Sequence, residues 1–166
     1  ELLITSGSSE ALFASILAIL DSGEEALIFS PHYPPYLSAV LVALGKPVLV
    51  PVERGTFTPN PEITAEKITG KTKLMIVNSP CNPTGAVYPR EVLRALAELA
   101  VDHDLYVVSD EVYDRFLFDG ETHVSIASFP GMAERTVVIG SFSKTYAMTG
   151  WRVGYVAGPE KVITRI

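Results

Sequence analysis

Residues 136–154 read TVVIGSFSKTYAMTGWRVG, an apolar run followed by a dense group of polar side chains. The β-branched and apolar residues at its start are typical of a buried strand. Ser141, Ser143 and Lys144 follow that strand directly, and Arg152 comes eight positions after the lysine. Hydroxyls and a guanidinium bind phosphate well, and a lysine amine beside them is a potential nucleophile. We therefore predict an anion-binding site with a reactive amine at the end of this strand.

This combination of phosphate-binding groups and a lysine is typical of a pyridoxal-phosphate (PLP) site, in which the lysine forms a Schiff base with the cofactor. The ordinary alternative for Lys144 is a surface lysine, and the neighbouring serines and Arg152 weaken that alternative. Nearby positive charge and partial desolvation would favour the neutral, nucleophilic amine. We therefore expect Lys144 to be partly desolvated.

Outward from this stretch, apolar runs alternate with helix-like segments and turn signals along most of the chain. The expected strands are residues 2–5, 26–29, 47–52, 74–77, 105–108, 136–139 and 153–157. The expected helices are residues 10–20, 36–44, 61–68 and 89–103, with a further helix from 159. Such alternation predicts an α/β protein, a three-layer α/β/α sandwich around a mainly parallel sheet of seven strands.

Some segments depart from this regular alternation. Residues 140–152 contain no convincing helix, and a parallel crossover generally needs one. We therefore expect the last strand to be the one antiparallel member of the sheet. Residues 112–130 are rich in aromatic side chains and give no clear pattern. A serine cap is expected before the helix that begins at Glu10.

Polar side chains gather where the expected strands end, which is where open α/β sheets bind ligands. Ser8 and Ser9 precede the first helix, whose free N–H groups favour phosphate, although taken alone they are better explained as a plain N-cap. Asp110 ends an apolar strand and is a candidate to keep a pyridine nitrogen protonated. Its alternative is a capping aspartate.

Further side chains are candidates to contact the cofactor ring. Tyr113 and Asn82 are candidates to bind its phenolic oxygen. A lone tyrosine is more often a packing residue, and an asparagine before a proline is often part of a turn. Tyr33 is a candidate to stack on a flat ring, or equally to lie on the core as a loop aromatic.

Composition narrows the class of protein. At 166 residues and 48% hydrophobic, the chain is long enough for one domain with its own core. A net charge of −6 argues against nucleic acid or an anionic membrane as a partner. Cys81 is alone and the three histidines lack ligand spacing, so no disulfide framework and no metal site are expected. Without a membrane-length apolar run or a signal peptide, a cytoplasmic enzyme domain is expected.

Other motifs fail on inspection. Gly70-Lys71-Thr72 resembles the end of a P-loop, but Ala65 stands where the first glycine of that motif is needed. The spacing of Ser141 and Lys144 matches the serine and lysine of penicillin-binding enzymes, but no Lys-Thr-Gly follows. An acyl-transfer function is therefore not favoured.

Taken together, the motifs resemble those of the class I/II aminotransferases, which are fold-type I PLP enzymes related to aspartate aminotransferase. The resemblance is to their large, cofactor-binding domain and runs essentially from end to end. The motifs that carry it are Ser30-Pro31-x-Tyr33-Pro34, Asn82-Pro83-Thr84-Gly85, Ser109-Asp110-Glu111-Val112-Tyr113, and Ser141-Phe142-Ser143-Lys144 with Gly150-Trp151-Arg152-Val153-Gly154.

The resemblance implies a role for each candidate residue. Lys144 would carry the Schiff base, Asp110 would pair with the pyridinium, and Tyr33 would lie against the ring. Tyr113 and Asn82 would bind the phenolic oxygen, and the Asn82–Pro83 bond would be cis. The phosphate would be held by Ser8, Ser9, Ser141, Ser143 and Arg152. The implied reaction is ping-pong transamination between an amino acid and a 2-oxo acid, with Lys144, Asp110 and Tyr113 as catalytic residues and a homodimer as the full-length assembly.

The resemblance leaves the organisation of the full-length protein and its exact reaction open. Residues 1–166 would be the PLP-binding large domain, without the N-terminal arm and the C-terminal small domain of the family. A related PLP-dependent lyase or synthase would share the same core. An aminotransferase-like sensor domain of a transcriptional regulator is a further alternative.

Overall fold

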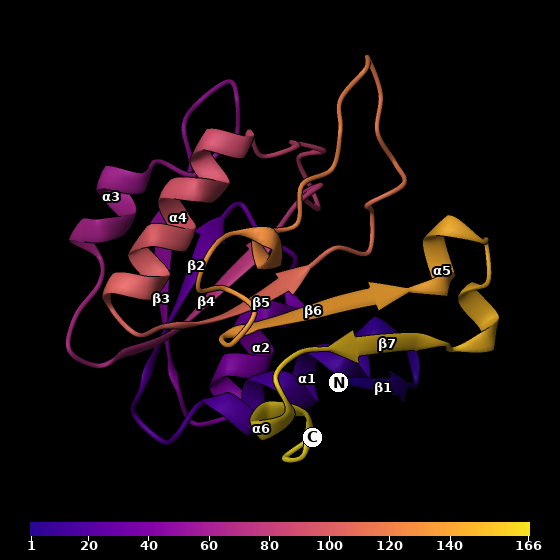
Figure 1. Ribbon diagram of the computed structural model, residues 1–166, viewed down its shortest axis with the longest axis horizontal. Coiled ribbons are helices and arrows are strands. Elements are labelled where there is room, and N and C mark those ends of the chain that lie inside the picture. Colours follow the sequence, from indigo (N-terminus) through magenta and orange to yellow (C-terminus); the bar gives the residue numbers. More distant parts are fainter.

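A computed structural model describes all 166 residues and places seven strands in one sheet (Figure 1). The strands are β1 (Leu2–Thr5), β2 (Glu25–Ser30), β3 (Lys46–Pro51), β4 (Thr72–Asn78), β5 (Tyr106–Asp110), β6 (Thr136–Ser141) and β7 (Gly154–Ala157). Their order across the sheet is β1-β7-β6-β5-β4-β2-β3. Only β7 runs antiparallel to its neighbours, β1 and β6. The predicted sheet and its one reversed strand are therefore confirmed.

The helices agree with the predicted segments except at some boundaries and in residues 140–152, where no helix was expected and a short one forms. They are α1 (Gly7–Ile19), α2 (Pro35–Val42), α3 (Pro61–Glu66), α4 (Arg90–Asp102), α5 (Phe142–Thr145) and α6 (Glu160–Ile163), with 3-10 turns η1 (Ile126–Ser128) and η2 (Thr149–Trp151). None of these helices combines the length and the hydropathy that a bilayer crossing requires.

The predicted serine cap of the first helix is wrong. Helix α1 begins at Gly7, three residues earlier than expected, so Ser8 and Ser9 lie within its first turn. Its cap residue is Ser6, whose side chain makes no capping hydrogen bond. The carboxylate of Glu10 instead accepts the Ser6 N–H, which satisfies one backbone donor at the start of the helix.

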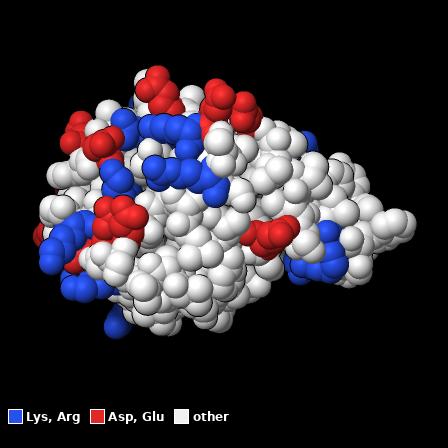
Figure 2. Space-filling model, turned by 90° about the horizontal axis from the view of Figure 1, so that it is seen from below, with Lys and Arg blue, Asp and Glu red and all other residues white.

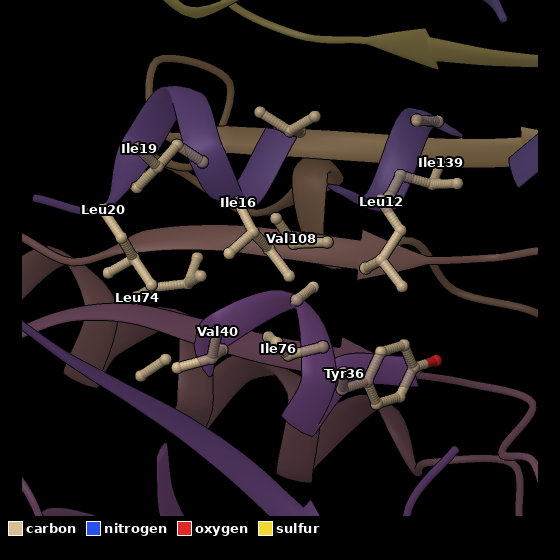
Figure 3. Close-up of a cluster of buried hydrophobic side chains, with 14 of the residues drawn as sticks. Leu12, Ile16, Ile19, Leu20, Tyr36, Val40, Leu74, Ile76, Val108 and Ile139 are labelled. Atoms are coloured by element: carbon tan, nitrogen blue, oxygen red, sulfur yellow. The ribbon is translucent and has the colours of Figure 1, made fainter. Parts of the chain in front are cut away.

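Helices cover both faces of the sheet, and each face has its own core. Side chains of α1, α2 and α6 pack on one face, and those of α4 pack on the other. On α4 the buried residues are Leu93, Leu96, Ala97 and Ala100, the spacing of a single helical stripe. Figure 3 shows Leu12, Ile16 and Ile19 of α1 directed toward the strands. This arrangement is the predicted three-layer sandwich.

The strand register brings the carboxyl ends of several strands to one edge. Asn78 at the end of β4 pairs with Asp110 at the end of β5, and Ser141 at the end of β6 pairs with Gly154. Gly154 also pairs with Thr5, the last residue of β1. Helix α5 continues outward from β6 beyond this edge (Figure 1). On the face seen in Figure 2, most charged side chains gather away from that end of the molecule.

Candidate active site

Asp110 is a buried carboxyl group at the centre of this edge. It retains 8% of its accessible surface and lies on the α1–α2 face, since Val108 two positions earlier belongs to that core. The Tyr36 hydroxyl donates to its Oδ2 at 2.6 Å, and the Val112 N–H donates to its Oδ1 at 3.3 Å. Burial raises the pKa of Asp110 above its ordinary value, and the Tyr36 hydrogen bond opposes that shift.

Tyr36 is a site residue that the sequence analysis missed, because it lies inside the predicted helix 36–44. It is buried, and Figure 3 shows its hydroxyl directed away from Val40, out of the apolar cluster. Burial and the neighbouring Asp110 raise the pKa of Tyr36 well above its ordinary value, so the hydroxyl remains a donor. Tyr36 therefore orients the Asp110 carboxylate.

Asn78 is a second residue that was missed. Its amide donates to the backbone oxygen of Asp110 at 2.9 Å, and its Oδ1 accepts the backbone N–H of Asn82 at 2.8 Å. It thereby ties the loop that carries Asn82 to the strand that carries Asp110. The signal that singled out Asp110, a polar residue ending an apolar strand, applies to Asn78 as well.

The N-terminus of α1 and Arg152 form a positively charged cradle. Gly7 has φ +73°, and a Cβ there would lie 2.9 Å from the Arg152 Cζ. A Cβ on Gly154 would lie 2.7 Å from the Ser8 nitrogen, so β7 begins directly against the start of α1. Arg152 donates to the Thr149 carbonyl at 2.9 Å and makes no ion pair with a carboxylate. A guanidinium beside a helix N-terminus is suited to bind an anion.

The candidate serines, which lie at the starts of α1 and α5, differ in exposure. Ser141 and Ser143 are buried, Ser8 is half-buried and Ser9 is exposed. The Ser141 Oγ accepts the Ser143 N–H at 3.1 Å and so caps α5, while its own O–H remains available as a donor. Because Ser141 and Thr5 flank Gly154, the end of β6 lies next to the start of α1.

Lys144 lies in the last turn of α5 with its side chain exposed. The expected partial desolvation is therefore wrong for the chain as it stands, because α5 projects beyond the sheet edge with little chain packed over it. The ammonium nitrogen is 5.8 Å from the centre of the Tyr113 ring, a cation–π arrangement. The structure thus brings Lys144 to the segment that directly follows Asp110.

Tyr33 and Asn82 lie on neighbouring loops. The Tyr33 ring meets the Tyr36 ring edge to face, with centroids 5.6 Å apart, so it is close to the residue that orients Asp110. Asn82 and Tyr113 line one hollow of about 280 Å³ together with Pro80, Cys81, Pro83, Gly85, Phe116 and Phe118. The Asn82–Pro83 peptide bond is cis, as the resemblance implied.

These residues fit the chemical groups of PLP. The cofactor has a phosphate, a basic ring nitrogen, a phenolic oxygen and an aldehyde. The cradle at Arg152 suits the phosphate, and the buried carboxyl of Asp110 suits the ring nitrogen. Asn82 and Tyr113 suit the phenolic oxygen, and the Lys144 amine suits the aldehyde. All of them are carried by elements that meet at one edge of the sheet.

The comparisons with known proteins identify the family. A family model for aminotransferase class I and II matches residues 1–166. An aspartate aminotransferase of Pyrococcus abyssi is 47% identical over all of this chain and 43% of its own length. An arginine–pyruvate transaminase of Pseudomonas aeruginosa is 48% identical over the whole chain and 42% of its own length. The crystal structure of an aromatic aminotransferase from Pyrococcus horikoshii superposes with a TM-score of 0.97 at 46% identity, covering 99% of this chain and 44% of the other.

The chain belongs to the class I and II aminotransferase family. It spans less than half the length of the relatives that it matches.

Proposed function

We propose that this chain binds PLP at the carboxyl edge of its sheet and that the full-length protein is an aminotransferase. The observation that carries the proposal is the convergence of one buried carboxyl group, one anion cradle and one lysine on the ends of β5, β1 and β6. PLP supplies an aldehyde that condenses with amines and a ring that accepts electrons.

In the proposed mechanism, the residues of this chain bind, orient and transfer protons. Arg152 and the N-terminus of α1 hold the phosphate, with the O–H of Ser141 as a further donor. Asp110, oriented by Tyr36, keeps a proton on the ring nitrogen and stabilises charge that develops in the transition state. The amine of Lys144 would hold the cofactor aldehyde and, when free, would move the proton at the substrate Cα.

The proposed substrates are an amino acid and a 2-oxo acid. The matching relatives are named for aspartate, aromatic amino acids and arginine, and all of these names describe amino-group transfer. That shared reaction supports transamination over a lyase, a synthase or a sensor domain. The shared reaction does not specify which substrate side chain is preferred, and we assign that preference to residues outside the cradle.

We further propose that residues 1–166 are the large, cofactor-binding domain of a homodimeric enzyme of the cytoplasm. Exposed apolar side chains support additional contacts for this domain, since Leu2, Ile4 and Trp151 keep 59%, 62% and 74% of their surface. Family members of more than twice this length support the presence of further segments in the full-length protein.

Absorbance spectroscopy of the full-length protein with added PLP tests this proposal. A visible band that borohydride converts to a stable adduct is expected, and mass spectrometry should place the adduct on Lys144. An amino-acid screen with 2-oxoglutarate should then show 2-oxo acid formation. A lyase would release ammonia or a thiol instead, and a sensor would bind PLP without turnover. An adduct on another lysine would overturn the assignment.

A further inference from the structure

Glu111 is the hub of a hydrogen-bonded cluster on the face of the sheet opposite Asp110. Its Oε1 accepts from the hydroxyls of Ser109 at 2.8 Å and Ser125 at 2.6 Å, and its Oε2 lies 2.8 Å from the Nε2 of His123. The side chains of Glu111 and His123 are only 12% and 16% exposed. We call Glu111, His123 and Ser125 the clasp.

The clasp closes the base of a long loop, residues 112–124, that contains no helix or strand and extends away from the sheet (Figure 1). The outgoing arm is fixed by the Asp114 N–H, which donates to the Glu111 carbonyl at 3.0 Å. The returning arm is fixed by the Glu111 carboxylate through His123 and Ser125. Both arms of the loop are therefore tied to the same residue.

Packing contributes little to the outer part of this loop, whereas Val112, Tyr113 and Val124 at its base lie against the two cores. A hollow of about 500 Å³ lies between its arms, lined by residues that include Arg115, Leu117 and Thr122. Phe118 near the tip keeps 73% of its surface. Segments with few buried apolar contacts open easily, so the outer part of the loop is held from its base, by this packing together with the hydrogen bonds of the clasp.

The loop carries part of the candidate active site. Tyr113, under the Lys144 ammonium, is its second residue, and the Phe116 ring meets the Tyr113 ring at 6.0 Å between centroids. Phe116 and Phe118 line the hollow that also contains Asn82. We propose that Glu111 and His123 are positioning residues, which hold the Tyr113 wall of the cofactor site through the base of this loop. The inference rests on the proposed PLP function.

The hydrogen bond to Glu111 is the one side-chain hydrogen bond that His123 makes. When Nε2 donates to Glu111, Nδ1 is the remaining polar atom of the ring, and it is buried without a partner. Leucine at this position would keep apolar bulk and remove the donor. Glutamine would present an N–H at a similar distance from the backbone and restore it. His123→Leu and His123→Gln are therefore a matched pair.

Trypsin cleavage tests the clasp without any cofactor, because Arg115 is the one lysine or arginine among residues 111–134. In the full-length protein, cleavage after Arg115 is expected to be about tenfold faster in His123→Leu, as loss of a part-buried hydrogen bond to a carboxylate predicts. His123→Gln should cleave nearly as slowly as wild type. Thr122→Ala, which removes an exposed neighbouring side chain without a side-chain hydrogen bond, is the control.

The PLP-loaded protein tests the positioning role. His123→Leu is expected to lower kcat roughly tenfold and to shift the pH midpoint of the bound cofactor's absorbance, because Tyr113 would no longer be held at the phenolic oxygen. His123→Gln should recover both properties. If His123→Leu does not fold, Ser125→Ala removes another donor of the same arm and should speed cleavage about threefold.

Each result decides the inference. Cleavage at the wild-type rate in both His123→Leu and Ser125→Ala would overturn the clasp. Faster cleavage with unchanged kcat and spectrum would overturn the positioning role. A wild-type protein that neither binds PLP nor transaminates would overturn the proposed function, and the cleavage rates would still decide whether the clasp holds the loop.

Discussion

Asp110 and Glu111 are adjacent carboxylates that face opposite sides of one sheet and have opposite environments. Asp110 is nearly inaccessible, yet it receives one short hydrogen bond, from Tyr36, and one long one from the Val112 N–H. Glu111 is more accessible and receives three short ones. Burial raises the pKa of Asp110, and its few donors leave that carboxylate available to a charged ligand, whereas Glu111 uses its hydrogen bonds to hold the chain in place. Substitutions on the two faces should therefore fail in different ways.

Removal of the amine on the Asp110 side should have the largest effect. Lys144→Ala is expected to lower transamination by the full-length protein about 10⁶-fold, because attachment and proton transfer are lost together. Stopped-flow absorbance of the amino-acid half-reaction measures this loss. Lys71→Ala, at an exposed lysine far from the sheet edge, should react as wild type. Turnover close to wild type in Lys144→Ala would contradict the assigned role.

Neutralising the two adjacent carboxylates should separate their roles. Asp110→Asn is expected to lower kcat on the order of 10²–10³-fold, because the ring nitrogen loses its charged partner. Glu111→Gln keeps one acceptor oxygen, and the other tautomer of His123 can accept from the new amide. The kcat of Glu111→Gln should therefore stay within about tenfold of wild type. Steady-state kinetics of both variants measure the ratio. Equal losses would show that the two faces do not differ as described.

Substituting alanine at two glycines should separate the effect of backbone strain on stability from the effect of the anion cradle on PLP binding. Gly7 and Gly23 both have positive φ, but only Gly7 touches another residue, Arg152, at the position of a Cβ. Both Gly→Ala variants are expected to lose about 1–2 kcal/mol of stability in urea unfolding from backbone strain. Gly7→Ala should additionally weaken PLP binding roughly tenfold, as expected when a charged contact to phosphate is displaced. Equal PLP affinity in the two variants would argue against the cradle.

The smallest expected effect is a pH dependence of stability without cofactor. A carboxyl group whose pKa is raised in the folded state binds its proton more tightly there than in the unfolded chain. Its contribution to stability is therefore full below the ordinary value of 3.8 and is lost as the pH rises through the raised value. The melting temperature of cofactor-free wild type should fall relative to Asp110→Asn over that range. A difference that is constant with pH would contradict the burial argument.

The strands were predictable because their signal is local. Runs such as residues 136–139 and 74–77 are β-branched and apolar, and no distant contact is needed to recognise them. The start of α1 was misplaced because it depends on distant residues. Gly154 and Arg152 pack against Gly7, and this contact fixes where the helix begins. The serines that resemble a cap lie inside the first turn instead.

The candidate site residues were found where they end a strand or belong to a motif, and missed where they act through another side chain. Tyr36 reaches Asp110 from a helix 74 positions away, which no local pattern indicates. His123 shows no ligand spacing and no role was predicted for it, but it pairs with Glu111 across a loop without regular structure. Residues 112–124 show no recognisable sequence pattern, because contacts between side chains distant in sequence hold the base of this loop.

The reversed direction of β7 explains why Lys144 and Arg152 can be close in sequence and still lie at the same end of the sheet. Because β7 runs against β6, its first residue, Gly154, meets the last residue of β6, Ser141. A parallel strand would have required a long crossover and would have delivered Arg152 to the far side of the sheet. A single reversal of the backbone instead lets one uninterrupted segment carry both candidate groups, the amine of Lys144 and the guanidinium of Arg152.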